Sequence, residues 1–222
     1  ELTASASFAA IQVHNIAGGA DLRGQNSRVD ARRVGNGLTA ESSFAEMHVE
    51  DIGGNAILKL QNGKIDALRI DGALTAANSF ASLLVHDVQG DVTLDSQNGE
   101  ILVQGVKGAV SAKTSFARIQ IAGDGKRFDV RNQNGPVQIT ALSSAVERIS
   151  ATTSFGPIAV NLPGDCQPLI RAATSFGKVH SDFPVVMNDT MPDAVFDAER
   201  AHPKVTLRGQ NGDIRVQTIA RR

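Results

Sequence analysis

The dipeptide Ser-Phe recurs along this chain every 36 residues, and Gln-Asn falls midway between successive copies. The first four copies of Ser-Phe begin at Ser7, Ser43, Ser79 and Ser115, and the first four copies of Gln-Asn begin at Gln25, Gln61, Gln97 and Gln133. The repeating unit is therefore 18 residues long and alternates between two forms. A fixed short period of this kind is typical of a solenoid, in which similar coils stack along one axis.

Each unit contains two stretches in which apolar and polar residues alternate. If the Ser or Gln is position zero, apolar residues occupy positions +4 and +6, as in Ile65 and Ala67, and +13 and +15, as in Leu74 and Ala76. A period of two indicates strands with one buried face. Another apolar residue at +9 and a glycine near +11 predict a corner between the two strands.

The pattern predicts one all-β domain over residues 1–222, a parallel β-solenoid with 18-residue coils. We expect a right-handed solenoid, because parallel crossovers are right-handed almost without exception. A helix is disfavoured because apolar residues at three-four spacing are missing and Gly and Asn interrupt the chain. A β-sandwich would not require a constant 18-residue register over eight units.

The two forms of the unit differ in the size of the residue four places before Phe or Asn. An alanine lies four residues before Phe44, Phe80 and Phe116, whereas a Leu or Val lies four residues before the Asn residues. We expect the Phe side chains to point inward and fill the space beside alanine, so that Phe80→Ala should cost about 3–5 kcal/mol. The Asn amides are expected to bond corner backbone groups rather than a ligand. The residues of this structural repeat are Phe8, Asn26, Phe44, Asn62, Phe80, Asn98, Phe116, Asn134, Phe155, Phe176 and Asn211.

The 18-residue register loosens after residue 140. Later units begin at Ser154, Ser175 and Gln210, and the last interval leaves an irregular segment with three prolines. We predict an insertion or cap at about 183–205 that folds over the C-terminal end or flank of the solenoid and buries Phe196; a binding loop is the alternative. The candidate interaction residues in this segment are Phe183, Met187, Met191 and Phe196, next to a loop at 165–168.

The chain begins inside a coil, because Leu2 and Ala4 match positions +13 and +15 of a unit whose start is missing. We therefore expect a piece of a longer protein, with membrane attachment only through a segment absent from this chain. Charge is balanced, with 22 basic and 23 acidic residues, and gives no argument for nucleic acid or anionic lipid as a partner. Position +16, which carries residues such as Arg23, Glu41 and Lys113, is interpreted as a solvated face of mixed charge.

No catalytic, cofactor-binding or metal-binding residue is predicted, and no cofactor is expected. The single cysteine, Cys166, cannot form an intrachain disulfide or a zinc site. His14 and His86 share a repeat position but lie four coils apart, too far to hold one ion. Asp30 and Asp66 are separated by two coils, and the signatures of polygalacturonases are missing.

The later units carry a motif of Ser or Gln, then Gly two residues on, then alternating apolar residues. It reads SFGPIAV at 154–160, SFGKV at 175–179 and QNGDIRV at 210–216. The chain resembles, over nearly its whole length, the bacterial adhesin-like β-solenoid domains of unknown function. The resemblance implies an extracytoplasmic location, periplasmic or at the cell surface, with an anchor in the full-length protein, and no catalytic residues.

The sequence and this resemblance together favour a non-catalytic scaffold or adhesin-like interaction module of the bacterial cell envelope. Its partner would be an unknown protein or a surface glycan. The alternative is a carbohydrate-active β-helix enzyme, a polysaccharide lyase or hydrolase. That alternative requires a cleft holding at least two carboxylates about 5–9.5 Å apart.

Overall fold

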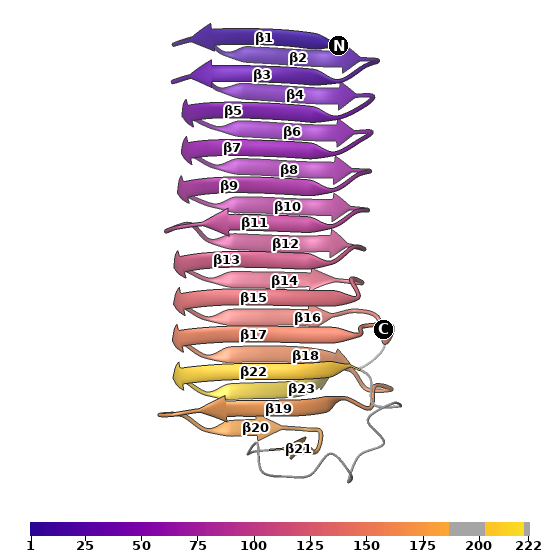
Figure 1. The fold of residues 1–222 in the computed structure, drawn as a ribbon, viewed down its shortest axis with the longest axis vertical. Helices are drawn as coiled ribbons and strands as arrows, with labels where there is room; N and C mark the ends of the chain where they lie inside the picture. The colour runs from indigo at the N-terminus through magenta and orange to yellow at the C-terminus, as the bar shows by residue number, and fades with distance from the viewer. Residues whose placement is uncertain (187–202, 220–222) are drawn as a thin grey trace.

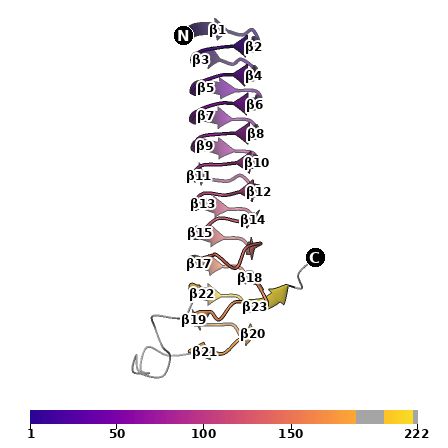
Figure 2. The same ribbon diagram turned by 90° about the vertical axis from the view of Figure 1, so that its right-hand side faces the viewer.

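The chain folds into two parallel β-sheets that lie face to face along one long axis (Figures 1 and 2). The computed structural model describes residues 1–186 and 203–219, and every regular element in these ranges is a strand. Successive coils pair in parallel with partners 18 residues apart, as Leu83 does with Ile101. The prediction of a single-domain parallel β-solenoid is confirmed.

The first sheet, sheet A, has 12 strands, and all of them except β22 have odd numbers. In chain order they are β1 (Leu2–Ser7), β3 (Ala20–Gln25), β5 (Leu38–Phe44), β7 (Ala56–Asn62), β9 (Leu74–Phe80), β11 (Val92–Ser96), β13 (Val110–Phe116), β15 (Arg127–Asn134), β17 (Arg148–Phe155), β19 (Leu169–Thr174), β21 (Val185–Val186) and β22 (Lys204–Asn211).

Sheet B has 11 strands and covers the opposite side of the interior. They are β2 (Ile11–Ile16), β4 (Val29–Val34), β6 (Met47–Ile52), β8 (Ile65–Ile70), β10 (Leu83–Val88), β12 (Ile101–Val106), β14 (Ile119–Gly123), β16 (Val137–Ala141), β18 (Ile158–Pro163), β20 (Val179–Ser181) and β23 (Ile214–Ile219).

The interior contains the residues that the period of two places inward. Ile65, Ile101 and Val137 are buried, as predicted for position +4. Along sheet A, position +15 alternates small and large residues from one strand to the next. In spatial order this column is Ala4, Leu22, Ala40, Leu58, Ala76, Leu94, Ala112, Val130, Ala151, Leu207 and Ala172. The alternation fills the narrow space between the sheets evenly, as dense packing requires.

The last coil in the sequence is not the last coil in space. Strand β22 lies between β17 and β19, and β23 lies between β18 and β20 (Figure 1). The units at Ser154 and Ser175 are both of the Ser-Phe form and follow each other in the chain. Insertion of the Gln-Asn unit at Gln210 between them restores the strict alternation of the two forms in space.

The phenylalanines do not fill the interior, so this prediction was wrong. Phe44, Phe80 and Phe116 are about half exposed, with exposed fractions of 49%, 53% and 54%. Each strand ends at its phenylalanine, where the chain turns a corner. The in-out alternation of the strand therefore does not extend to the phenylalanine. The inward position of the corner is held instead by the residue two places earlier, such as Ser42 or Asn78, which is buried.

The irregular segment is described only at its two ends. Phe183 is partly buried against the core, and β21 pairs with β19 at the far end of sheet A. Met187, Met191 and Phe196 lie outside the described residues, as does most of the expected cap. The insertion ends earlier than residue 205, because β22 already begins at Lys204. In the described ranges, no helix is long and apolar enough to cross a membrane.

Candidate functional site

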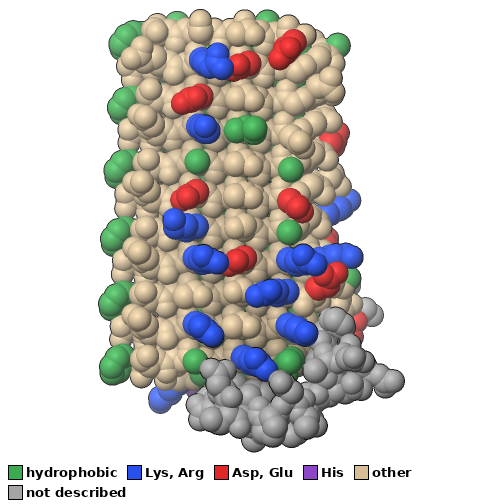
Figure 3. Space-filling model, viewed as in Figure 1, with side chains coloured by type: hydrophobic (Ala, Val, Ile, Leu, Met, Phe, Trp, Pro, Cys, Tyr) green, Lys and Arg blue, Asp and Glu red, His purple; other side chains and the backbone are tan. Residues whose placement is uncertain are grey.

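A line of exposed phenylalanines runs along one edge of the solenoid. We call it the phenylalanine row, and it consists of Phe8, Phe44, Phe80, Phe116, Phe155 and Phe176. Each lies at or just after the C-terminal end of a sheet A strand. In Figure 3 a column of hydrophobic side chains follows this edge at the left of the view. Successive members are two coils apart, or about 10 Å at the usual strand spacing.

Asparagine separates neighbouring phenylalanines along the row. Asn62 is the register partner of both Phe44 and Phe80. Asn134 and Asn211 flank Phe155 in the same way, so the out-of-order coil continues the pattern. The edge therefore presents alternating aromatic and amide groups, with a period of two coils.

Buried polar side chains one layer below hold the corner together. In six coils the residue before the Ser or Gln is polar and buried: Ser42, Asn78, Ser96, Thr114, Asn132 and Thr153. Ser42 Oγ donates to the carbonyl oxygen of Ser27 at 2.8 Å, and Asn132 Nδ2 donates to that of Ala117 at 2.7 Å. These bonds satisfy corner carbonyl groups that would otherwise be buried without a partner.

The predicted role of the repeat asparagines is mostly taken over by this buried layer. Asn98 Nδ2 reaches the carbonyl oxygen of Ser79 at 3.5 Å, the outer limit of a hydrogen bond. For Asn26, Asn62, Asn134 and Asn211, no side-chain hydrogen bond is found to any described residue. The amides of the row are thus available to a partner on the outside.

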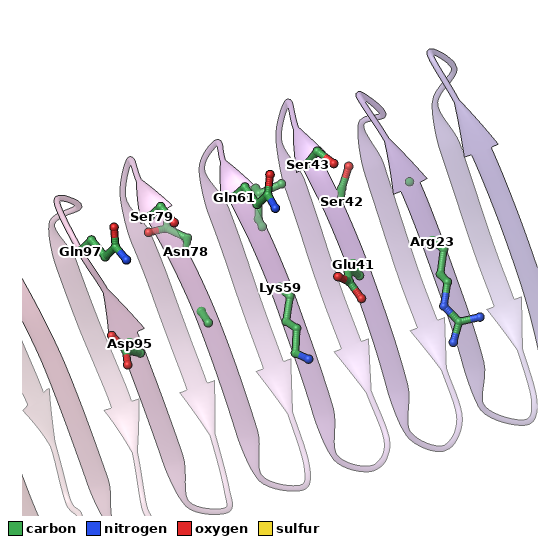
Figure 4. A pocket seen from close by; sticks show the side chains of 13 residues that line it. Arg23, Glu41, Ser42, Ser43, Lys59, Gln61, Asn78, Ser79, Asp95 and Gln97 are labelled. Carbon is green, nitrogen blue, oxygen red and sulfur yellow. The ribbon is translucent and has the colours of Figure 1, made fainter.

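An open groove of about 630 Å³, lined mainly by residues with polar side chains, runs beside the row on the outer face of sheet A. Ser43, Gln61, Ser79 and Gln97 form one line along it (Figure 4). A second line consists of Arg23, Glu41, Lys59 and Asp95. The charge of this second line alternates in sign along the axis, so the groove has hydrogen-bonding capacity and no net charge.

A charged cluster of paired cations and anions occupies sheet B and the adjoining corner. Arg32 donates to both carboxylate oxygens of Asp30 at 2.7 and 3.0 Å. Arg69 donates to Glu50 and, at 2.6 Å, to Asp51. The hydrogen bond from Arg32 lowers the pKa of Asp30, and those from Arg69 lower the pKa of Glu50 and of Asp51. Each cation in this cluster therefore has an anionic partner.

The structure offers little for metal or nucleophilic chemistry among the residues it describes. No three His, Cys, Asp or Glu side chains in residues 1–186 and 203–219 are grouped so as to hold a metal ion. Cys166 is buried, and burial raises the pKa of its thiol, with a smaller contribution from Asp165. A thiol with a raised pKa is a weak nucleophile at neutral pH. His48 contacts Glu50 and Asp66 at 3.4 and 3.6 Å, within the charged cluster.

Comparisons of the chain with protein-family models, with curated proteins and with solved structures found no match. Interpretation of the surface therefore depends on its own geometry. The phenylalanine row stands out in that geometry, because monomeric proteins seldom align large apolar side chains in the open. Its residues were found from the sequence, but their exposure was not.

Proposed function

We propose that this chain is a non-catalytic scaffold of the bacterial cell envelope whose solenoids associate side by side through the phenylalanine row. The observation that carries the proposal is the alignment of six exposed phenylalanines on one edge. The location in the envelope is supported by the resemblance to adhesin-like β-solenoids. The occupant of the row that we infer is a second copy of this chain.

The apolar area of the row is close to what a dimer needs. The exposed fractions run from 49% for Phe44 to 79% for Phe8 and Phe176. Together the six side chains expose as much as three to four complete phenylalanines, or about 700 Å² at roughly 200 Å² each. Stable interfaces bury about 800 Å² on each partner. The row with its flanking Asn, Ser and Gln residues reaches that size.

The period of the row also favours a second copy. A partner must present groups at intervals of about 10 Å along a straight line to contact every phenylalanine. A second copy of this solenoid has that interval because it carries the same row. When two rows are shifted by one coil, each phenylalanine of one copy lies opposite an asparagine of the other. An antiparallel pair of this kind is related by a two-fold axis, the commonest symmetry of protein dimers.

The test replaces part of the row by the residue that alternate coils already hold there. In the variant Phe44→Asn/Phe80→Asn/Phe116→Asn, we expect the fold to persist, because Asn62 and Asn134 occupy the same corner. Sedimentation velocity should show an associated wild-type protein and a monomeric triple variant. The matched control is Ile57→Asn/Leu142→Asn, which removes exposed apolar side chains away from the row and should associate like the wild type.

Two results would overturn the proposal. One is a wild-type protein that stays monomeric at every accessible concentration. The other is a triple variant that associates as strongly as the wild type. If a monomeric wild type binds a surface glycan and the triple variant does not, the row serves adhesion and self-association is wrong.

A further inference from the structure

Positive charge gathers on the outer face of sheet A in the half that contains β13 to β22. We call this area the basic face, and it consists of Lys113, Arg127, Arg131, Arg148, Lys204 and Arg208. Figure 3 shows Lys and Arg side chains concentrated in the lower half of the view. The nearly balanced charge of the whole chain conceals this local excess.

The basic residues are stacked in register, where like charges repel. Arg127 pairs with Arg148, and Arg148 pairs with Lys204, so three cations occupy neighbouring strands about 4.8 Å apart. Lys113 pairs with Arg131 in a second column, which continues through Thr152 to Arg208. Like charges directly opposite each other on a sheet are destabilising. Such an arrangement is expected where an anion is bound.

The other half of the same face shows how the protein neutralises its charges elsewhere. The second column continues the line Arg23, Glu41, Lys59, Ala77 and Asp95, in which sign alternates. After Lys113 the alternation stops, and the charged residues that follow in the column, Arg131 and Arg208, are both cations.

Few carboxylates balance the basic face within the described part of the chain. Arg127 contacts Glu147 at 3.4 Å and Arg131 contacts Asp129 at 3.5 Å, both near the surface. Arg148, Lys204 and Arg208 have no ion pair with any described residue. The outward positions of β17 and β22 between the two columns carry hydroxyls, those of Ser150 and Thr206. Among the described residues, these three cations are therefore left for an anionic ligand to pair with.

We infer that the basic face binds an acidic polysaccharide chain. Guanidinium groups recognise carboxylates and sulfates through paired hydrogen bonds, and five donors per arginine suit a flat, repetitive ligand. The hydroxyls of Ser150 and Thr206 lie between cation columns about 13 Å apart and can bond sugar hydroxyls. The outward positions between the columns carry no aromatic ring on which a nucleic-acid base could stack and no large apolar group to enter a lipid layer.

This inference does not depend on self-association through the phenylalanine row. The row follows the edge of the solenoid, whereas the basic face occupies the middle of sheet A. A solenoid could use one surface, the other or both. The experiments that test them use different residues and different readouts.

The test measures binding of fluorescently labelled polygalacturonate and heparin, with neutral dextran as a reference, by fluorescence anisotropy at low ionic strength. The triple variant Arg148→Gln/Lys204→Gln/Arg208→Gln should bind about tenfold to a hundredfold more weakly. The reason is that each cation beside an anionic surface raises the affinity about fivefold. Binding by the wild type should fall as salt is raised. All three side chains point outward, so thermal unfolding followed by circular dichroism should show an intact fold.

The matched control, Arg23→Gln/Lys59→Gln/Lys64→Gln, removes the same charge from the opposite half of the molecule and should change affinity less than about twofold. Equal loss in both variants would show that only net charge matters and would overturn the inference. Equal binding of dextran would do the same. Tighter binding of single-stranded DNA or of anionic phospholipid vesicles than of either acidic polysaccharide would assign the face to another class of ligand.

Discussion

The corner residue that follows each Phe or Asn of the repeat is small, being glycine, alanine or, at Ser27, serine, and at two of the glycines the choice has a steric cause. Gly63 and Gly99 follow asparagine, whereas Ala45 and Ala81 follow phenylalanine. A Cβ atom on Gly63 would lie 1.6 Å from the carbonyl oxygen of Ala45, and one on Gly99 would lie 1.7 Å from that of Ala81. The coils approach too closely there for any side chain. At these two corners the Asn-Gly dipeptide is thus required by stacking as well as by the turn.

At this scale we predict that Gly99→Ala destabilises the protein by about 3 kcal/mol, because neighbouring coils must move apart to admit the methyl group. Urea denaturation followed by circular dichroism measures the change. Ala81→Gly is the control at the same corner, since glycine readily adopts the positive φ of 113° found there. A loss smaller than about 1 kcal/mol in Gly99→Ala would contradict the close approach.

Prediction from the sequence succeeded for residues inside strands and failed at the corner. Positions such as Ile65 and Val137 were assigned correctly because in-out alternation is maintained wherever a strand continues. Phe44 and Phe80 were assigned wrongly because alternation stops where the chain turns. The small polar residues at Ser42 and Asn78 were a usable signal. They fall at an inward position, and a buried polar residue there indicates that the corner is already filled.

Among the elements, the pair β22–β23 is the one that departs from chain order. Direct stacking of β19 on β17 would place Ala172 beside Ala151 and leave a void in the interior. With β22 between them, Leu207 fills that space. The size alternation of the core therefore explains the insertion, and the same alternation brings Asn211 between two phenylalanines of the row.

We predict that cysteines introduced at Thr152 and Arg208 form a disulfide in a Cys166→Ser background. These positions are register partners, and parallel partners lie about 4.8 Å apart, within the range that a disulfide spans. Cysteines at Thr152 and Ala173 should stay reduced, because β22 separates them. Mass spectrometry after mild oxidation distinguishes the two pairs. The reverse result would place β19 directly against β17.

The basic face depends on this element and could not be found from the sequence. Arg148 and Lys204 are neighbours only because β22 enters the stack beside β17. Counting 18-residue units along the chain places them in coils that do not touch. The interpretation of position +16 as a mixed solvated face was therefore correct for Arg23 and Glu41 but missed the change of character beyond Lys113.

Over the whole molecule, one group of paired charges links stability to pH. Near β4, β6 and β8 the carboxylates of Asp30, Glu50 and Asp51 have lowered pKa values because arginines donate hydrogen bonds to them. A lowered pKa in the folded state contributes stability above the ordinary value, and this contribution is lost as pH falls through the folded value. The ordinary values are 3.8 for Asp and 4.5 for Glu.

We predict that the melting temperature falls mainly below about pH 4.5 and that Arg69→Met flattens this dependence, because it removes the donor to Glu50 and Asp51. The variant should melt lower than the wild type at neutral pH and approach it in acid. Arg118→Met, which removes an exposed arginine from a different corner, serves as the control and should keep the wild-type profile. Parallel profiles for wild type and Arg69→Met would contradict the prediction.

The position of β22 and β23 also imposes an order in time. During synthesis, residues 148–181 leave the ribosome before residues 204–219, which must lie between their two coils. Until then β17 and β18 expose unpaired backbone edges, and β19 and β20 have nothing of the right form to stack on. The stack is completed by a segment that inserts between two coils synthesised earlier, and not by a coil added at its end. Nascent chains paused before residue 204 should therefore be the species most prone to pair with one another.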